Sequence, residues 1–234
     1  LSFPEDERSR MASYCTTQGR ARAEIVEKKS RFIATVQHVE TEEEALAFLD
    51  ETRSEHRMAR HNVYAYVLRE NGRVRYSDDG EPQKTAGMPT LEAIQYADLT
   101  DVAVVVTRYF GGILLGTGGL VRAYTQATQA GIAAADIVRV SRCIDMLIEV
   151  PYSLYEQAQR LAGQHGAQTL DADFAAQVAL TFRMLDGTQE PFKEALTELV
   201  RGQCPILESD PYDAPFAVSG QAGPSAPDAA PNLT

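Results

Sequence analysis

The sequence predicts a two-domain protein of the α+β class, and two observations support this prediction. Apolar residues follow strand spacing and then helical spacing in both halves of the chain, and the order of strands and helices differs between the halves. The pattern changes after Asp136, where helical spacing gives way to a long strand-like alternation. We therefore expect one domain at residues 22–138 and a second at 139–209, because each has an apolar pattern of its own.

The two ends of the chain lack such periodicity. Residues 1–21 are predicted to be a disordered leader, in which Met11 is the expected natural start and the preceding residues an extension. Residues 210–234 hold five prolines among small and polar residues, a composition typical of a disordered tail.

The first domain is predicted to have the order β-β-α-β-β-α-β-α. Thr41 and Glu44 have the spacing of a capping box at the start of a helix. The Asn71-Gly72 pair is a signal for a hairpin turn between two strands. In chain order we expect two strands within 23–39, a helix from 41, strands at 63–68 and 74–76, a helix at 91–99, a strand at 102–106 and a helix that ends near 134.

The second domain is predicted to have the order β-α-β-β-α-β. Strand-like alternation runs through 143–150 and 178–184, and helical spacing relates residues within 154–162 and 192–199. Short strands near 167–170 and 205–207 complete the order of a split βαβ sandwich of the ferredoxin-like type. This half has neither a glycine-rich loop nor a catalytic-looking cluster, so we expect a packing or partner-binding module.

Composition indicates a soluble, cytoplasmic protein without a membrane segment, because the apolar runs are far shorter than a membrane span and the N-terminus is acidic. Three widely spaced cysteines favour free thiols.

The net charge of −11 argues against a protein that coats nucleic acid without sequence preference. Residues 1–136 carry 16 basic and 20 acidic side chains, against 6 and 13 in the remainder, so any polyanion-binding surface belongs to the first half. Its expected cations are Arg53, Arg57, Arg60, Lys84, Arg108 and Arg122.

A glycine-rich stretch, TRYFGGILLGTGGLVRAY at 107–124, joins a buried-looking strand to the last helix of the first domain. Gly111 and Gly112 permit positive φ or a close approach, and residues 116–119 leave backbone N–H groups uncovered where the helix begins. These groups attract anions, and the flanking arginines add charged donors for a phosphate or carboxylate. Alternatively, the glycines only let the helix pack tightly against its sheet. At position 118 we expect the backbone conformation to require glycine.

Two more polar segments have no evident role in a core, namely HRMARH at 56–61 and SDDGEPQKTAGMP at 77–89. If their strands are neighbours of the glycine-rich strand, the three segments meet at one edge of the sheet. Asp78, Asp79 and Glu81 offer oxygen ligands for a hard cation. Acidic residues in such loops are more often turn formers, so we expect no metal and no cofactor. Ser77 has no flanking glycine elbow and none of the three cysteines has an adjacent base, which argues against nucleophilic catalysis.

Residues 22–136 closely resemble the IMPACT/YigZ family in three segments, which are ARHNVYAY, SDDGEP with TAGMP, and VTRYFGGILLGTGGLVRAY. The resemblance implies an N-terminal α/β sandwich like a domain of a small-subunit ribosomal protein, a fold shared with GHMP kinases. It also implies a ferredoxin-like C-terminal domain similar to the last domain of elongation factor G. One departure is that Gln83 and Lys84 replace a small residue and a glycine that the family usually has there.

The family's eukaryotic members resemble translation regulators, so the predicted function is a non-catalytic, translation-associated regulator that binds RNA, the ribosome or a translation factor. The alternative is an enzyme that binds a small molecule or a nucleotide phosphate at the glycine-rich turn, although GTGGL lacks the larger phosphate-loop pattern. The residues expected to form the binding surface, with its anion or phosphate ligand, are His61, Asp78, Asp79, Glu81, Lys84, Thr85, Arg108, Tyr109, Gly111, Gly112, Gly116, Thr117, Gly118, Gly119 and Arg122.

Overall fold

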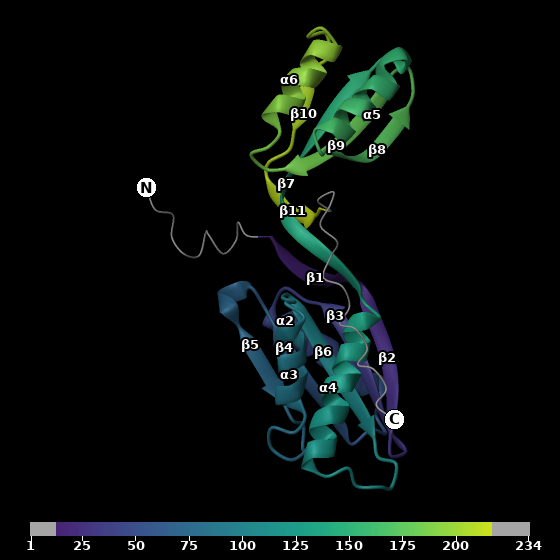
Figure 1. Cartoon of the computed structure of the whole chain (residues 1–234), viewed down its shortest axis with the longest axis vertical. Coiled ribbons are helices and arrows are strands. Elements are labelled where there is room, and N and C mark those ends of the chain that lie inside the picture. Colours follow the sequence, from purple (N-terminus) through teal and green to yellow (C-terminus); the bar gives the residue numbers. More distant parts are fainter. Residues whose placement is uncertain (1–12, 217–234) are drawn as a thin grey trace. The chain divides into compact units, whose positions relative to one another are not determined.

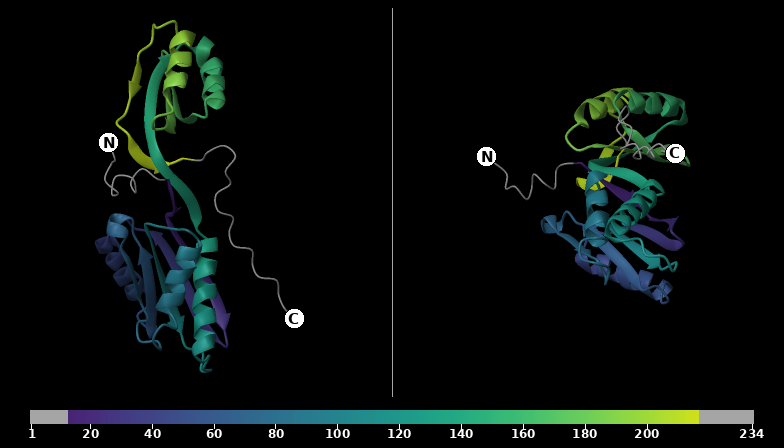
Figure 2. Two further views of the ribbon diagram at one scale, coloured as in Figure 1. Left: turned by 60° about the vertical axis from the view of Figure 1, so that its left-hand side comes forward. Right: turned by 60° about the horizontal axis from the view of Figure 1, so that its bottom comes forward.

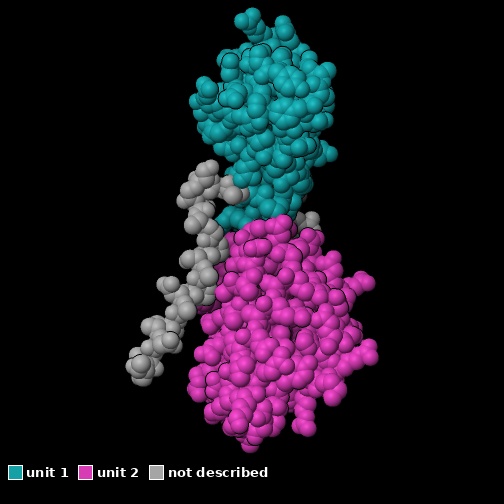
Figure 3. Space-filling model, turned by 90° about the vertical axis from the view of Figure 1, so that its right-hand side faces the viewer, with its two compact units in different colours: residues 1–13, 139–221 teal, residues 14–138, 222–234 magenta. Residues whose placement is uncertain are grey.

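The structure is a computed structural model that describes residues 13–216. The chain forms two compact units, which we describe separately (Figure 3). The N-terminal unit comprises residues 14–138, and the C-terminal unit begins at Arg139. Within residues 13–216, no helix is both long and apolar enough to cross a membrane.

The N-terminal unit is built on a five-stranded sheet in which all neighbours are antiparallel. Its central strand β6 is buried along nearly its whole length, as the run of β-branched residues predicts. In spatial order the strands are β2 (Arg20–Glu27), β3 (Ser30–His38), β6 (Val102–Tyr109), β4 (His61–Val67) and β5 (Val74–Ser77).

Helices cover both faces of this sheet (Figures 1 and 2). On one face lie α3 (Gly87–Tyr96) and α4 (Thr117–Ala133), whose apolar residues pack with Phe32, Val104 and Val106. On the other lies α2 (Glu42–Glu55), which packs on Val105 and Tyr66. Alternate residues of β6 therefore enter two different cores, which explains why no position in this strand is polar before Thr107.

The predicted start of α2 is confirmed with one change in detail. The Thr41 hydroxyl accepts from the Glu44 N–H at 3.2 Å, as in a capping box. The Glu44 carboxylate, however, accepts from the N–H of Glu40 at 2.7 Å. The Asn71-Gly72 turn is also present, as a short 3-10 helix, Glu70–Gly72, with Asn71 at a φ of 56°.

The prediction of a disordered leader at 1–21 is wrong for its last part. β1 (Tyr14–Gln18) is an ordered strand in which Cys15, Thr16 and Thr17 are buried, and β2 begins at Arg20. The Cys15 carbonyl accepts from the Thr100 N–H at 3.0 Å, and the Thr16 hydroxyl donates to the Asp101 carbonyl at 3.0 Å. These bonds join residues far apart in sequence, which is why local periodicity did not reveal the strand. The first twelve residues lie outside the described part of the chain.

The C-terminal unit contains the predicted order of β-α-β-β-α-β. Its long strand β7 (Asp136–Val150) pairs with β9 (Val178–Leu185) on one edge and β10 (Ile206–Glu208) on the other, and β8 (Gln168–Phe174) lies beyond β9. All these pairs are antiparallel. Two amphipathic helices, α5 (Tyr155–Gln164) and α6 (Glu190–Leu199), pack their apolar stripes on this sheet. A one-turn 3-10 helix, Tyr152–Leu154, precedes α5.

The predicted disordered tail at 210–234 begins too early. β11 (Tyr212–Pro215) pairs with Val140 to Cys143 of β7, and Ala214 and Phe216 are buried beside Cys143. Of the five prolines that suggested disorder, Pro211 precedes this strand and Pro215 ends it, positions that a sheet edge tolerates. Residues 217–234 lie outside the described residues.

Strand register defines two ends of the N-terminal sheet. Arg31 is paired with Tyr109, and His61 with Arg108, so four connections lie at the end that we call the loop end. These connections are β2–β3 (28–29), α2–β4 (56–60), β5–α3 (78–86) and β6–α4 (110–116). The remaining connections, at 19, 39–41, 68–73, 97–101 and 134–135, lie at the opposite end.

Candidate functional site

The three polar segments singled out in the sequence meet at the loop end, as predicted (Figure 1). His61 starts β4 and Arg108 lies opposite it on β6. The loop after β5 then brings Glu81 to Arg108 and Asp79 to His61. Antiparallel pairing of β4 with both β5 and β6 is the reason for this convergence.

Glu81, Arg108 and Tyr124 form a buried polar cluster. Arg108 Nη1 donates to Glu81 Oε1 at 2.6 Å, and the Tyr124 hydroxyl donates to the same oxygen at 2.8 Å. The side chains of Glu81 and Arg108 are only 4% and 7% exposed. Burial, reinforced by the Glu81 charge, raises the pKa of Tyr124, so this hydroxyl remains a donor. The cluster ties the loop to β6 and α4, and its charges are neutralised within the fold.

Asp78 caps the start of α3. One carboxylate oxygen accepts from the N–H groups of Ala86 and Gly87 at 3.0 and 2.8 Å, and the other accepts from the Lys84 N–H at 2.8 Å. Negative charge at a helix N-terminus satisfies free N–H groups and is favoured by the helix dipole. The loop therefore ends at Ala86, three residues before the predicted end at Pro89, and Asp78 has a structural role.

Asp79 joins three elements of the fold. Its carboxylate accepts from the Arg53 side chain at 3.0 Å and from the Asn62 N–H at 2.6 Å. Its carbonyl lies 2.8 Å from His61 Nδ1, which therefore carries a proton, and His61 Nε2 lies 3.9 Å from Glu81 Oε1. The three carboxylates of this loop thus point at different partners. Among residues 13–216, no group of three His, Cys, Asp or Glu side chains has the arrangement of a metal site.

Tyr109 and Thr85 are also held by neighbours. The Tyr109 hydroxyl lies 2.9 Å from His56 Nδ1, and the Arg31 guanidinium lies 5.5 Å from its ring centroid. Burial and the nearby charge of Arg22 lower the pKa of His56, which keeps this imidazole neutral near pH 7. The buried Thr85 hydroxyl donates to the Pro82 carbonyl at 2.7 Å.

Lys84, the residue that departs from the family pattern, has a left-handed backbone with a φ of 59°. Glycine adopts this conformation without the steric penalty that a side chain incurs. This explains why a glycine suits the position. Here the loop keeps the conformation and presents an exposed lysine on its surface.

In the glycine-rich loop, Gly111 is required by a close approach. A Cβ at this position would lie 2.0 Å from the carbonyl carbon of Lys29 in the β2–β3 turn, and the Gly111 N–H donates to the Ser30 hydroxyl at 3.1 Å. Gly112 has a φ of 86° but open space around it. The glycine at 111 therefore fixes the loop to the neighbouring hairpin.

The start of α4 is open. Gly116 is the N-cap with a φ of 74° and a ψ of 167°, a conformation restricted to glycine, and the helix has neither a side-chain cap nor an acidic residue in its first turn. The expectation that Gly118 is a backbone requirement is wrong, because its φ is not positive and the nearest atom to an added Cβ is the Arg122 tip at 3.7 Å. Gly119 does have a close neighbour, with Leu115 Cβ at 3.0 Å. Thr117, Gly118 and Arg122 are exposed.

The structure thus divides the predicted residues into two groups. His61, Asp78, Asp79, Glu81, Thr85, Arg108, Tyr109 and Gly111 make contacts that hold the loop end together. Lys84, Gly112, Gly116, Thr117, Gly118 and Arg122 lie exposed on its surface. Gly119, half-buried against Leu115, belongs to neither group.

Sequence reasoning missed several exposed residues of the same end. Lys28 and Lys29 form the β2–β3 turn and are exposed. Large apolar side chains are also exposed there, in the loops after α2 and β6, namely Met58, Phe110, Ile113 and Leu114, with Leu114 82% exposed. The signals were present as a Lys-Lys pair between two strand-like runs and as an Ile-Leu-Leu run between glycines.

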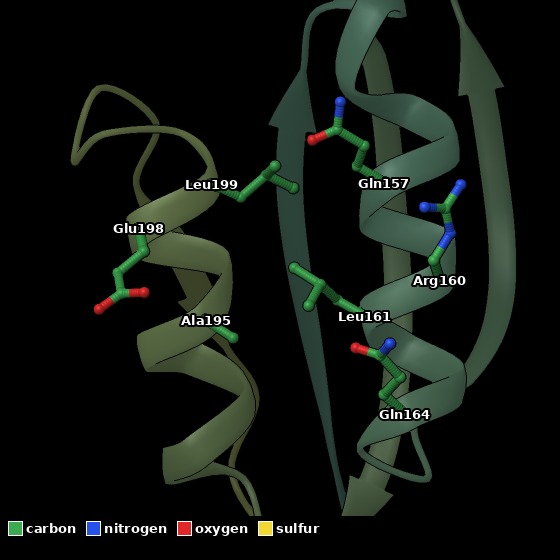
Figure 4. A pocket seen from close by; sticks show the side chains of 7 residues that line it. All are labelled: Gln157, Arg160, Leu161, Gln164, Ala195, Glu198 and Leu199. Atoms are coloured by element: carbon green, nitrogen blue, oxygen red, sulfur yellow. The ribbon is translucent and has the colours of Figure 1, made fainter.

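The C-terminal unit has an open groove of about 370 Å³ between α5 and α6. Leu161 and Leu199 point toward one another across it, whereas Arg160 and Glu198 point away (Figure 4). Its lining brings together no acid and base at bonding distance, and we assign it no chemistry.

Comparison with known proteins gives matches along most of the chain. The Impact N-terminal domain matches residues 28–132, and a domain of unknown function, DUF1949, matches 148–203. An IMPACT family member of Haemophilus influenzae is 38% identical over 200 residues, which cover 84% of this chain and 97% of the relative. The IMPACT family member YvyE of Bacillus subtilis is 35% identical over 199 residues, with coverages of 85% and 92%.

A solved crystal structure of a hypothetical protein is similar in both sequence and fold. It is 32% identical, has a TM-score of 0.56, and the match covers 84% of this chain and 97% of that one. The matches to family members extend through both units and include the segments that meet at the loop end. The chain therefore belongs to the IMPACT family.

Proposed function

We propose that this protein is a non-catalytic regulator that acts with the translation machinery by binding RNA, the ribosome or a translation factor. Membership of the IMPACT family supports the proposal, because eukaryotic members resemble translation regulators. The observation that carries it is that Asp78, Asp79 and Glu81 are all bonded within the fold. No carboxylate of this loop is left to act as an acid, a base or a metal ligand. The outer surface, in contrast, carries exposed cations and the backbone N–H groups at the uncapped start of α4.

The site residues follow the same division. We propose that the exposed group, comprising Lys84, Gly112, Gly116, Thr117, Gly118 and Arg122, faces the partner. The bonded group, which includes Glu81 and Arg108, holds that surface in shape. Binding then depends on the bonded group only through the stability of the loop end.

A phosphate-using enzyme is the second candidate, favoured by the uncapped start of α4. Free N–H groups at a helix start bind phosphate well. Phosphoryl transfer also needs a carboxylate for magnesium and a positioned nucleophile. The carboxylates nearest in the loop end are engaged elsewhere, so the binding function has the better support.

Sedimentation through sucrose gradients tests the proposal. The full chain is mixed with purified bacterial ribosomes or with separated subunits, and fractions are probed for the protein across a salt series. We expect co-migration with one subunit at low salt and release as salt rises, because charged contacts are screened. Protein that stays at the top of the gradient at every salt concentration, while calorimetry detects nucleotide binding, would favour the enzyme.

We also propose names and limits for the two units. The antiparallel order β10-β7-β9-β8 with two helices supports a ferredoxin-like C-terminal domain. For the N-terminal unit, we propose the α/β sandwich shared with ribosomal proteins and GHMP kinases. We infer domains close to 22–138 and 139–209, extended by β1 and β11, and a cytoplasmic location.

A further inference from the structure

The loop end of the N-terminal unit carries six exposed cations that make no ion pair among residues 13–216. They come from all but one of its four connections and from the second turn of α4. Lys28 and Lys29 lie in the β2–β3 turn, Arg57 and Arg60 between α2 and β4, Lys84 before α3, and Arg122 on α4. The backbone pairing of β2, β3, β6, β4 and β5 puts these segments at the same end of one sheet (Figure 1).

Acidic groups at this end do not cancel these charges. Asp78 accepts from backbone N–H groups, and Asp79 and Glu81 are neutralised by Arg53 and Arg108. In the described residues of these connections and the adjoining strand ends, Glu27 is the one acid without a bonded partner. The six cations therefore give the loop end a positive surface.

The opposite end of the same unit has the reverse sign. Its acids are Glu40, Glu42, Glu43, Glu44, Glu70, Asp98, Asp101 and Asp136. The arginines nearby are each engaged with acids, since Arg73 and Arg75 contact Glu42, and Arg69 contacts Asp101. The unit is thus electrically polarised along its strands, a feature that its small net charge conceals.

Apolar groups lie among the cations of the loop end. Phe110 is 49% exposed, and its ring centroid lies 5.6 Å from the Arg108 guanidinium carbon, which supports the ring from the protein side. Ile113 and Leu114 extend the apolar surface, and Met58 adds to it from another loop. An exposed aromatic ring beside cations is the combination that binds single-stranded nucleic acid, through stacked bases and neutralised phosphates.

We propose that the loop end is the contact surface for single-stranded RNA, with phosphates on the six cations and at the open start of α4, and a base stacked on Phe110. Binding of RNA at the loop end rests on the proposed function, and it specifies the surface and the ligand through which that function is carried out. The same residues fit an anionic lipid surface less well. Insertion of Leu114 would carry the irregular backbone of 110–116 and the free N–H groups of α4 into hydrocarbon, where they have no acceptors, whereas phosphate oxygens accept from them.

Fluorescence anisotropy of the full chain with a labelled oligouridine of about twelve nucleotides tests this directly. The test variant is the double substitution Lys28→Glu and Lys29→Glu. Its matched control is Arg160→Glu and Arg201→Glu, two exposed cations of the C-terminal unit that make no ion pair among the described residues. Both variants change the net charge from −11 to −15, so only the position of the charge differs.

We expect the test variant to bind about tenfold or more weakly at moderate salt and the control to change less than about threefold. The slope of log affinity against log salt should be roughly −2 to −4 for the natural protein, and its magnitude should fall by about 1.4 in the test variant. Phe110→Ala should weaken binding about tenfold, and Phe110→Tyr should restore it, because both rings stack. Thermal unfolding of each variant shows whether it remains folded.

Three outcomes would overturn the inference. Equal losses in test and control variants would mean that affinity follows net charge and not this surface. Binding to vesicles of anionic phospholipid without binding to RNA would assign the surface to membranes. A natural protein that co-sediments with ribosomes but binds no RNA would leave the proposed function standing and identify a protein contact in place of RNA. Absence of co-sedimentation would instead count against the proposed function itself.

Discussion

The β5–α3 loop at 78–86 and the β6–α4 loop at 110–116 lie at the same end of one sheet, and their polar atoms have opposite roles. In the first, the carboxylates of Asp78, Asp79 and Glu81 are each bonded to another part of the fold. In the second, glycines and exposed apolar residues lead to a helix start without a side-chain cap. Polarity in a sequence therefore marks two different things, internal bonding in one loop and accessible surface in the other.

The difference has a physical cause. A buried carboxylate must be paired or bonded, because leaving it unpaired costs several kcal/mol, so acids carried toward β6 and α3 find partners there. Glycine has no side chain to bond, and its backbone N–H can stay open to solvent or to a ligand. The following predictions test this contrast, from the largest expected effect to the smallest.

Glu81→Ala should lower the free energy of unfolding by about 3–5 kcal/mol, because it leaves the buried Arg108 charge without its partner. The same change removes the acceptor of the buried Tyr124 hydroxyl. Urea unfolding followed by circular dichroism measures the loss. Glu92→Ala, on the exposed face of α3, is the control and should change stability by less than about 0.5 kcal/mol.

A Glu81→Ala protein as stable as the control would show that the cluster of Glu81, Arg108 and Tyr124 does not stabilise the fold. Glu81 would then return to the group of residues available for binding. The distinction between the two loops would lose its main support.

Gly111→Ala and Gly118→Ala should have opposite effects on stability. At 111, the added Cβ meets the Lys29 backbone at 2.0 Å, so the hairpin must move, and we expect a loss of about 2–3 kcal/mol. At 118, the space is open and alanine has the higher helix propensity, so we expect a gain of up to about 1 kcal/mol. Thermal unfolding of the two variants compares them directly, and a loss at both positions would contradict the assignment of Gly118 to the open surface.

The order of elements was predictable because it rests on local spacing. The capping pair at Thr41, the turn at Asn71-Gly72 and the alternation in β7 and β9 each lie within a few residues, and each predicted element is present. β1 and β11 were missed because their order depends on partners more than fifty residues away, such as Thr100 for Cys15 and Cys143 for Tyr212. Short strands without strong alternation have little local signal.

The location of the candidate site was predictable from the sequence, but the residues that form its exposed surface were less so. Sequence reasoning brought His61, Asp79 and Arg108 to one edge, and the register agrees. It had no means of telling which charges are neutralised, since Glu81 pairs with a residue 27 positions away and Tyr124 reaches the same oxygen from α4. It also assigned the cations of the β2–β3 turn no role, because the location of that turn depends on the sheet order.

Lys84→Gly should produce the smallest effect and the one that separates stability from binding. Glycine relieves the left-handed backbone at φ 59° but gains freedom in the unfolded chain, so the expected net gain in unfolding free energy is about 0.5–1 kcal/mol. Loss of the exposed charge should also reduce the slope of log RNA affinity against log salt by about 0.7 in magnitude.

Lys84→Ala is the matched control, since it removes the same charge and keeps a Cβ at the strained position. It should share the weaker RNA binding without the gain in stability. If alanine stabilises the protein as much as glycine does, the charge of the lysine and not its backbone conformation is the source of the lost stability, and the loop at 78–86 then contributes to the positive surface at a cost to the fold.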